Sequence, residues 1–172
     1  ASATIQATET IIADHDMAEH GYAWVDTNWQ EVQQEKDGPY IDTGGVSPLI
    51  RAAVKTLPPT SQQTFDAGWL SGTVATMENT AALGFIAVRD LYDQPASIRA
   101  GRAWQRLHLW ATTQGLSMQP INQMPEVVDR DRQLNRTSAV AAVMDNLTGD
   151  PFWRPTFVFR VGYPLNDLLP SA

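Results

Sequence analysis

The chain has 172 residues, which suits one domain with a substantial core, and its formal net charge at pH 7 is −7. This acidic balance argues against a nucleic-acid backbone or an anionic membrane as the main partner. The absence of cysteine excludes disulfides, thiolate chemistry and cysteine-ligated metal sites. No run approaches the roughly 20 apolar residues of a membrane span, and no signal peptide begins the sequence. We therefore expect a cytoplasmic protein, or a periplasmic one if an export signal lies upstream.

The first third of the chain is expected to be helical with two turns. Apolar residues recur at helix-compatible spacing within Ile5–Glu35, and Gly21 is expected to break or bend this segment into two helices. Turn signals follow at Lys36–Pro39 and Asp42–Gly45. Ser47-Pro48 then predicts a helix that ends at Pro58-Pro59, because serine is a good N-cap and proline suits the first helical position.

The middle of the chain is expected to supply a helix and two strands. The pattern predicts a helix over Thr60–Gly72 and a strand over Thr73–Met77. Leu83–Val88 is a better strand candidate, because it is a short apolar run bounded by turns. Arg89–Gln94 is expected to form a polar loop that leads through Pro95 into the longest helix.

The stretch Arg99–Gln123 predicts a long helix, a stop, a short extended segment and a polar turn. Leu109 interrupts the polar side of the helix, so the helix is expected to lie in a core or at a subunit interface. Gln114-Gly115 stops it, since glycine adopts the left-handed conformation without a Cβ clash. Leu116–Ile121 is extended and Asn122-Gln123 follows directly. One broad helical face is formed by six apolar residues: Ala100, Ala103, Trp104, Leu107, Trp110 and Ala111.

The last part of the chain completes a small sheet covered by helices. Pro125-Glu126 is expected to open a loop or a short helical turn, and Gln133–Leu147 to form the last helix, which ends at Thr148–Pro151. Pro155–Tyr163 is rich in β-branched and aromatic residues and predicts the final strand. The whole chain, residues 1–172, is thus expected to be a single α+β domain.

Motifs for metal binding or nucleophilic catalysis are weak. His15 and His20 are five residues apart, whereas a zinc helix needs a spacing of four, so a solvated helix face is the preferred interpretation. His108 is expected to be a packed or interface histidine. Asp129 and Asp131 are flanked by arginines and indicate a solvated charge cluster. No Gly-x-Ser-x-Gly sequence occurs, so no catalytic residue and no metal ligand is assigned.

Several segments, taken in order, resemble the flavin-dependent nitroreductases. Gly101–Gln123 is similar to that family's long central helix and following strand, and Phe159–Pro164 is similar to its late Arg-x-Gly-Tyr-Pro strand. Gly21–Trp24, Lys36–Pro39 and Asp42–Ser47 are most similar to the subgroup named for the mycobacterial Acg protein, in which one chain holds two nitroreductase-like halves. The resemblance covers most of residues 20–164 and implies a nitroreductase-like fold.

The resemblance also implies an FMN site at a subunit or half-domain interface. Backbone N–H groups beside the flavin would face N5 and O4, and only this backbone role carries over, because the family has Glu-Gly where this chain has Asn122-Gln123. Implied partners are NAD(P)H, a nitro or quinone-type acceptor, and a second copy or a complementary N-terminal half. The implied cofactor-binding residues are Gln119, Pro120, Ile121, Asn122 and Gln123.

Two departures from the family pattern leave alternatives open. The family's N-terminal Arg-x-Ser-x-Arg segment, which grips the flavin phosphate, is absent, and the chain stops at Pro170–Ala172, where paired basic residues usually stand. These losses suggest the C-terminal half of a longer protein. The alternatives are a flavin-binding protein without turnover and a structural dimerisation half-domain. In the former, an aromatic lid is expected from Trp24, Trp29, Phe152 and Trp153.

Overall fold

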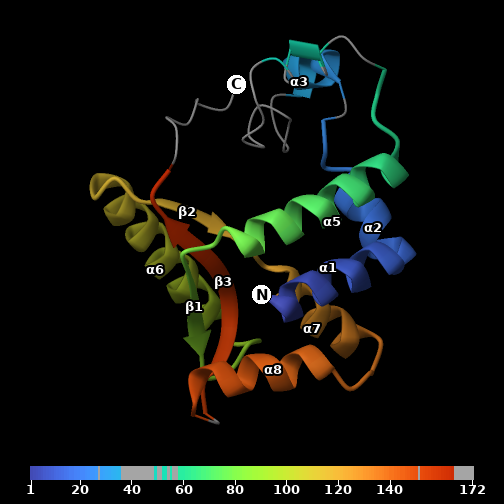
Figure 1. Cartoon of the computed structure of the whole chain (residues 1–172). Coiled ribbons are helices and arrows are strands. Elements are labelled where there is room, and N and C mark those ends of the chain that lie inside the picture. Colours follow the sequence, from blue (N-terminus) through green and yellow to red (C-terminus); the bar gives the residue numbers. More distant parts are fainter. Residues whose placement is uncertain are drawn as a thin grey trace.

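A computed structural model describes residues 1–26, 28–35, 49, 52–53, 55, 58–150 and 152–164. The architecture is α+β, as expected, with helices on both sides of a small antiparallel sheet (Figure 1). In chain order the elements are α1 (Ser2–Ala13), α2 (His15–Tyr22), α3 (Trp29–Glu35), α5 (Gln62–Glu78), β1 (Ala82–Val88), α6 (Gln94–Thr113), β2 (Ser117–Pro120), α7 (Gln123–Gln133), α8 (Ala139–Thr148) and β3 (Arg154–Gly162).

The last strand lies in the centre of the sheet. The strand order is β1-β3-β2, and β3 is antiparallel to both neighbours. Gly84 of β1 is the partner of Phe159, and Gln119 of β2 is the partner of Arg160. The register shifts between Ile86 and Ala87, where a bulge bends the edge strand. The two segments on which the nitroreductase resemblance chiefly depends, 101–123 and 159–164, are therefore hydrogen-bonded neighbours.

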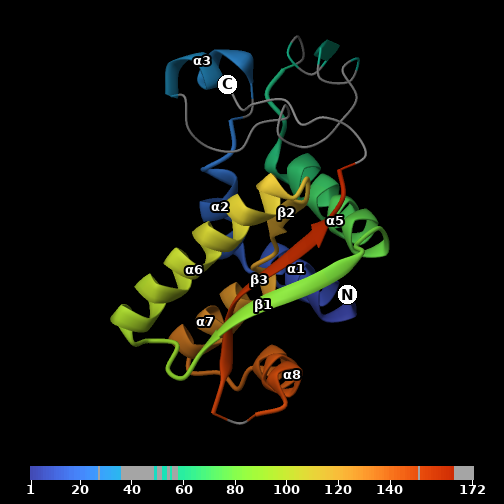
Figure 2. The same ribbon diagram turned by 90° about the vertical axis from the view of Figure 1, so that its left-hand side faces the viewer.

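The sheet separates one solitary helix from a layer of several. In Figures 1 and 2, α6 lies alone along one face, whereas α1, α5, α7 and α8 lie on the other side. Both views place α3 at the opposite end of the molecule from α8. Because α6 has no second helix over it in the described part of the chain, its outer surface is free of intramolecular packing there.

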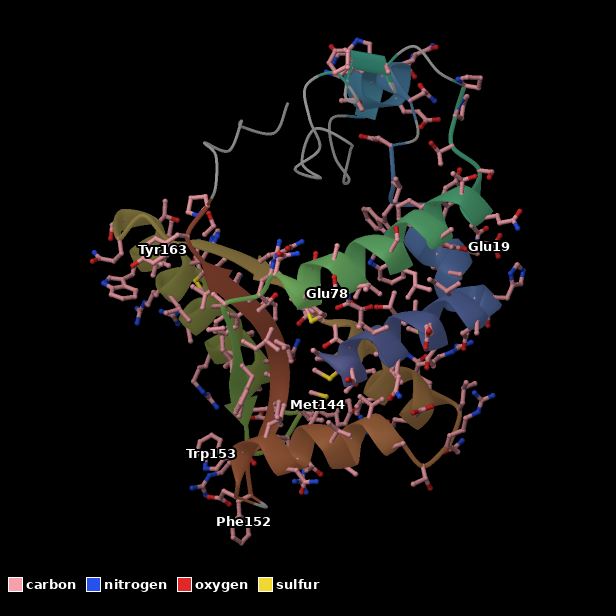
Figure 3. All side chains as sticks on the ribbon, viewed as in Figure 1. Glu19, Glu78, Met144, Phe152, Trp153 and Tyr163 are labelled. Atoms are coloured by element: carbon pink, nitrogen blue, oxygen red, sulfur yellow. The ribbon has the colours of Figure 1, made fainter. Side chains whose placement is uncertain are left out.

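The main core lies on the many-helix side. It joins α1, α7, α8 and β3, and Trp69 of α5 packs against its margin. Met144 points from α8 toward α1 and α7 (Figure 3). These side chains hold the start of α7 against β3, which fixes the position of the preceding turn. The buried residues of this core are Ala7, Ile11, Met124, Val127, Met144 and Val158.

On the other face, small and aromatic residues seat α6 on the sheet. Ala96 and Ala100 pack with Val88 in a second buried cluster. Trp104 contacts the rings of Phe157 and Phe159, with centroid distances of 4.7 and 5.1 Å. The expectation of an apolar inner face is correct for Ala100, Trp104, Leu107 and Ala111 but wrong for Ala103 and Trp110, which are exposed. The helix α6 covers the sheet from outside and is not a central core helix.

The first helical segment breaks earlier than expected. Asp14, in extended conformation, separates α1 from α2, and its carboxylate accepts a hydrogen bond from the Met17 N–H at 3.2 Å. Gly21 lies inside α2, so the expected break at glycine is wrong. An aspartate that caps the next helix satisfies donors that a helix start leaves free, and this local bonding wins over the continuous apolar spacing.

Two other segments form full helices where a strand, and a loop or short helical turn, were expected. Residues 73–77 continue α5, and the buried Thr73 and Met77 lie four residues apart on its inner side. Residues 123–133 form α7, whose Pro125 lies in the first turn, where proline is tolerated. The last helix begins only at Ala139, where Ser138 caps it. Tertiary packing on the main core thus overrides the β-branched composition of the first segment and the turn signal of the second.

The remaining predicted elements within the described residues are confirmed. Gly115 ends α6 with φ of 70°, and the Leu116 N–H donates to the Ala111 carbonyl at 2.9 Å, as in a glycine-terminated helix. Strands form at β1, β2 and β3, and Gly149, with φ of 64°, follows α8. The turns at 36–39 and 42–45, and most of the helix expected after residue 47, lie outside the described residues. Among the described helices, none has both the length and the apolar character to cross a bilayer.

Candidate functional site: the turn between β2 and α7

Beyond the pairing of β2 with β3, three hydrogen bonds join the turn Gln119–Gln123 to the central strand. The Ile121 N–H donates to the Val158 carbonyl at 2.8 Å, and the Val158 N–H donates back to the Asn122 Oδ1 atom at 3.0 Å. Arg160 Nε donates to the Gln119 Oε1 atom at 2.8 Å. These bonds hold the turn in place from one side, so its other polar groups have a fixed position.

The start of α7 presents backbone donors. Asn122 precedes the helix, but its side chain bonds Val158 and does not cap the helix. Within the described residues, the N–H groups of Asn122, Gln123 and Met124 have no hydrogen-bond acceptor. The first N–H groups of a helix lack intrahelical partners and carry the positive end of the helix dipole. This turn can therefore bind an acceptor atom or a developing negative charge.

The side chains of the five expected cofactor residues divide between surface and interior. Gln119 and Pro120 are exposed, Ile121 is buried, and Asn122 and Gln123 are partly buried. The Gln123 Oε1 atom is buried without a hydrogen-bond partner within the described part of the chain. A buried acceptor without a donor carries a desolvation penalty, and because this atom is closed to solvent, a ligand can bond it only after the Gln123 side chain turns outward.

In kind, though not in shown geometry, these groups complement the polar edge of an isoalloxazine. That edge offers acceptors at N5 and O4 and a donor at N3–H, and the turn offers backbone donors and one unpaired acceptor. The turn contains no charged side chain. The one cationic side chain that bonds it within the described residues is Arg160, through Gln119. The described turn thus suits a flat heterocycle with mixed donors and acceptors, and it provides no cluster of cations for a phosphate.

The outer side of α6 is a second unusual surface. Ile98, Leu109 and Trp110 are 58%, 60% and 57% exposed. The helix has three arginines and no acidic residue, although the chain is strongly acidic. Within the described residues, Arg99 pairs with Asp93 at 3.5 Å, and no ion pair involves Arg102 or Arg106. Exposed large apolar groups next to free cations are typical of an interface rather than of a solvated face.

The residues expected to form an aromatic lid do not lie together. Phe152 and Trp153 lie at the foot of the sheet beside α8 (Figure 3), where Arg89 packs over the Trp153 ring at 5.4 Å. Trp24 follows α2, and Trp29 begins α3 at the opposite end of the molecule. The idea of one lid made from all four residues is therefore wrong.

The histidines and carboxylates form no metal site in the described part of the chain. His15 pairs weakly with Glu19 at 3.8 Å, and His20 Nδ1 lies 2.6 Å from the Asp16 carbonyl. His108 stacks on Trp104, with ring centroids 5.2 Å apart, but the residue is exposed and therefore not buried in the packing of α6. Asp129 accepts a hydrogen bond from the Tyr92 hydroxyl at 2.8 Å and is not simply solvated.

The sequence predicts the position of the turn but not the bonds that fix it. In the sequence, Arg160 is recognisable only as part of a strand motif, and nothing there indicates that Asn122 accepts a hydrogen bond from β3. Because side chains alternate along a strand, Arg160 lies on the same face of β3 as Val158. This alternation is the sequence signal that could have identified Arg160 as a neighbour of the turn. The pairing partner, however, depends on the strand order.

Comparison of the chain with models of protein families, with curated proteins and with solved structures found no match in any of the three.

Proposed function

We propose that this chain is an FMN-dependent, nitroreductase-like oxidoreductase that passes electrons from NAD(P)H to nitro or quinone-type acceptors. The main support is that the backbone N–H groups of Asn122–Met124 have no acceptor within the described residues and that the Gln123 Oε1 atom has no donor there. The pairing of β2 with β3 adds support, because it joins the two segments that resemble the nitroreductases.

Each group of the turn has a distinct role in this proposal. FMN, when bound, supplies the redox chemistry, and the protein binds it and adjusts its electron distribution. The N–H groups of Asn122, Gln123 and Met124 stabilise negative charge on the ring edge. Once its side chain turns toward the ring, the Gln123 amide oxygen would accept a hydrogen bond from the imide N–H and so orient the ring. Asn122 acts as a positioning residue, since its side chain is already bonded to Val158.

A partner completes the site in this proposal. The turn lacks phosphate-binding cations, and the α6 surface formed by Ile98, Leu109 and Trp110 is suited to a second body. That body is either a second copy of this chain or a complementary N-terminal half, and it contributes the phosphate contacts. The same α6 surface favours one alternative, a half-domain whose role is association and whose flavin is held elsewhere.

Colour and released cofactor test the proposal directly. The purified chain, incubated with FMN and then desalted, is expected to be yellow and to release FMN on heating. Anaerobic NADH or NADPH is expected to bleach this colour, and turnover of a nitroaromatic should follow. Colour without bleaching would favour a flavin-binding protein without turnover. A colourless protein that is associated through α6 would favour the dimerisation half-domain.

A variant separates the turn from general effects on the fold. Gln123→Ala removes the unpaired acceptor and is expected to weaken FMN retention by roughly tenfold, the effect of one hydrogen bond. Gln133→Ala, at the other end of α7, is the matched control and should retain FMN as the parent does. Equal retention by both variants would contradict the assignment of Gln123.

A further inference from the structure

A cleft of about 670 Å³ opens between α2, α5 and α7, separate from the β2–α7 turn. One wall is aromatic: the rings of Tyr22 and Phe65 are 5.7 Å apart, and those of Phe65 and Trp69 are 6.5 Å apart. Trp24 also lines the cleft and is 69% exposed. The cleft thus offers several aromatic faces at one place, and one of the indoles is largely uncovered.

Carboxylates from two helices also line the cleft. Asp66 of α5 and Glu126 and Asp129 of α7 all line the cleft. In the described part of the chain, no cation forms an ion pair with any of these three carboxylates. Among the side-chain hydrogen bonds of the described residues, these carboxylates take part in one, which Asp129 accepts from the Tyr92 hydroxyl.

The arginine that also lines the cleft is already occupied. Arg130 Nε donates to Asp14 Oδ2 at 2.7 Å, and its Nη2 atom donates to Asp14 and Asp16 at 2.8 and 2.9 Å. Its positive charge is therefore neutralised by these two aspartates and does not compensate Asp66, Glu126 or Asp129. Desolvation, and then the charge of Asp129, raise the pKa of Glu126, although both residues are exposed, so Glu126 still faces the open cleft.

The lining selects among possible ligands. A bare metal ion does not fit, because the described residues contain no group of three metal-ligating side chains. An anion would meet uncompensated carboxylates. A positively charged group, in contrast, gains both from the carboxylates and from the electron-rich faces of the rings, and an apolar body gains from contact with Ile11 and Met17 on the same lining.

We propose that this cleft binds a small organic cation, an ammonium group carried on an apolar body. The aromatic wall of Tyr22, Phe65 and Trp69 contacts the apolar body, and the faces of its rings attract the cation. Asp66, Glu126 and Asp129 supply the countercharge. The site is independent of any flavin at the turn, so it stands or falls apart from the function proposed above.

Benzyltrimethylammonium is the probe, titrated into the 172-residue chain by calorimetry and followed by tryptophan fluorescence. Saturable binding of one equivalent is expected, whereas benzyl alcohol and phenylacetate, the neutral and anionic counterparts, should bind at least tenfold more weakly. Binding of benzyl alcohol as tight as that of the cation would overturn the proposal. The same holds if no saturation occurs up to roughly 10 mM cation.

Variants assign the binding to the cleft. Phe65→Leu keeps an apolar side chain but removes the ring, and Asp66→Asn with Glu126→Gln removes two charges; each change is expected to weaken binding about tenfold. Glu9→Gln, on the exposed side of α1, is the matched control and should bind as the parent does. Circular dichroism verifies that each variant is folded. Unchanged binding in folded Phe65→Leu and in the folded charge variant would overturn the location.

Discussion

At the scale of single residues, Asn122 joins the candidate site to the fold. Its Oδ1 atom accepts the Val158 N–H at 3.0 Å, next to the buried Val158 side chain. Asn122→Ala leaves that N–H without a partner and is expected to lower the free energy of unfolding by about 1–2 kcal/mol. Asn122→Asp keeps an acceptor oxygen and should recover much of this loss. Urea denaturation measures both, and equal losses in the two variants would contradict the bond.

Arg130 carries the second residue-scale prediction, which concerns pH. Its hydrogen bond is the largest cause that holds the pKa of Asp14 below the ordinary value of 3.8. Because the folded-state pKa lies below the unfolded one, this group stabilises the fold above pH 3.8, and that contribution is lost as the pH falls through the lowered value.

Arg130→Met is therefore expected to lower the thermal midpoint at neutral pH, and its midpoint should fall less steeply with acid than that of the parent. Arg136→Met, which removes an exposed arginine from the segment after α7, is the control and should keep the parent's pH profile. Thermal melts from pH 7 to about pH 3 compare the three proteins. Parallel profiles for the parent and Arg130→Met would refute the role of this pair.

At the scale of elements, sequence patterns predict the helices and strands that are bounded by strong local signals such as turns and glycine stops. β1, β2 and β3 were predicted because short apolar or β-branched runs lie between turns, and α6 because its apolar face and Gly115 stop are local features. The helical course of residues 73–77 was not predictable in this way. It depends on the packing of Thr73 and Met77 inside the fold, a contact between segments distant in the sequence.

Gly84 shows how the pairing of two strands fixes a residue. It is opposite Phe159, and a Cβ atom at this position would lie 2.5 Å from the Cζ atom of the Phe159 ring. That ring also contacts Trp104, so it has little room to move. Gly84→Ala is therefore expected to destabilise the fold by about 2 kcal/mol, the usual effect of overpacking.

A glycine in α5 provides the control for this change. A Cβ atom at Gly72 would meet no atom within 4 Å, so Gly72→Ala should stabilise the protein by about 0.5–1 kcal/mol through the higher helix propensity of alanine. Urea denaturation is expected to shift the two midpoints in opposite directions. A Gly84→Ala midpoint at or above the parent value would show that the ring can move away.

At the scale of the whole molecule, the candidate site illustrates what a sequence can and cannot supply. The position of the turn follows from the local order of helix, glycine, strand and amides. Its free donors do not, because Asn122 could equally have capped α7; only the presence of β3 alongside diverts its side chain. The acidic aromatic cleft was missed for a similar reason, since its walls come from three helices that are far apart in the sequence.

The outer surface of α6 leads to the prediction at this scale. If Leu109 and Trp110 contact a second copy, the chain should sediment as a dimer, and the double variant Leu109→Glu/Trp110→Glu should sediment as a monomer with an unchanged far-ultraviolet spectrum. Leu147→Glu, which places the same charge on an exposed leucine of α8, is the control and should leave the dimer intact. A parent chain that is monomeric at all concentrations would exclude the second copy. The complementary half would then be the remaining proposed occupant, because only a partner with a different surface could bind α6 while the chain does not associate with itself.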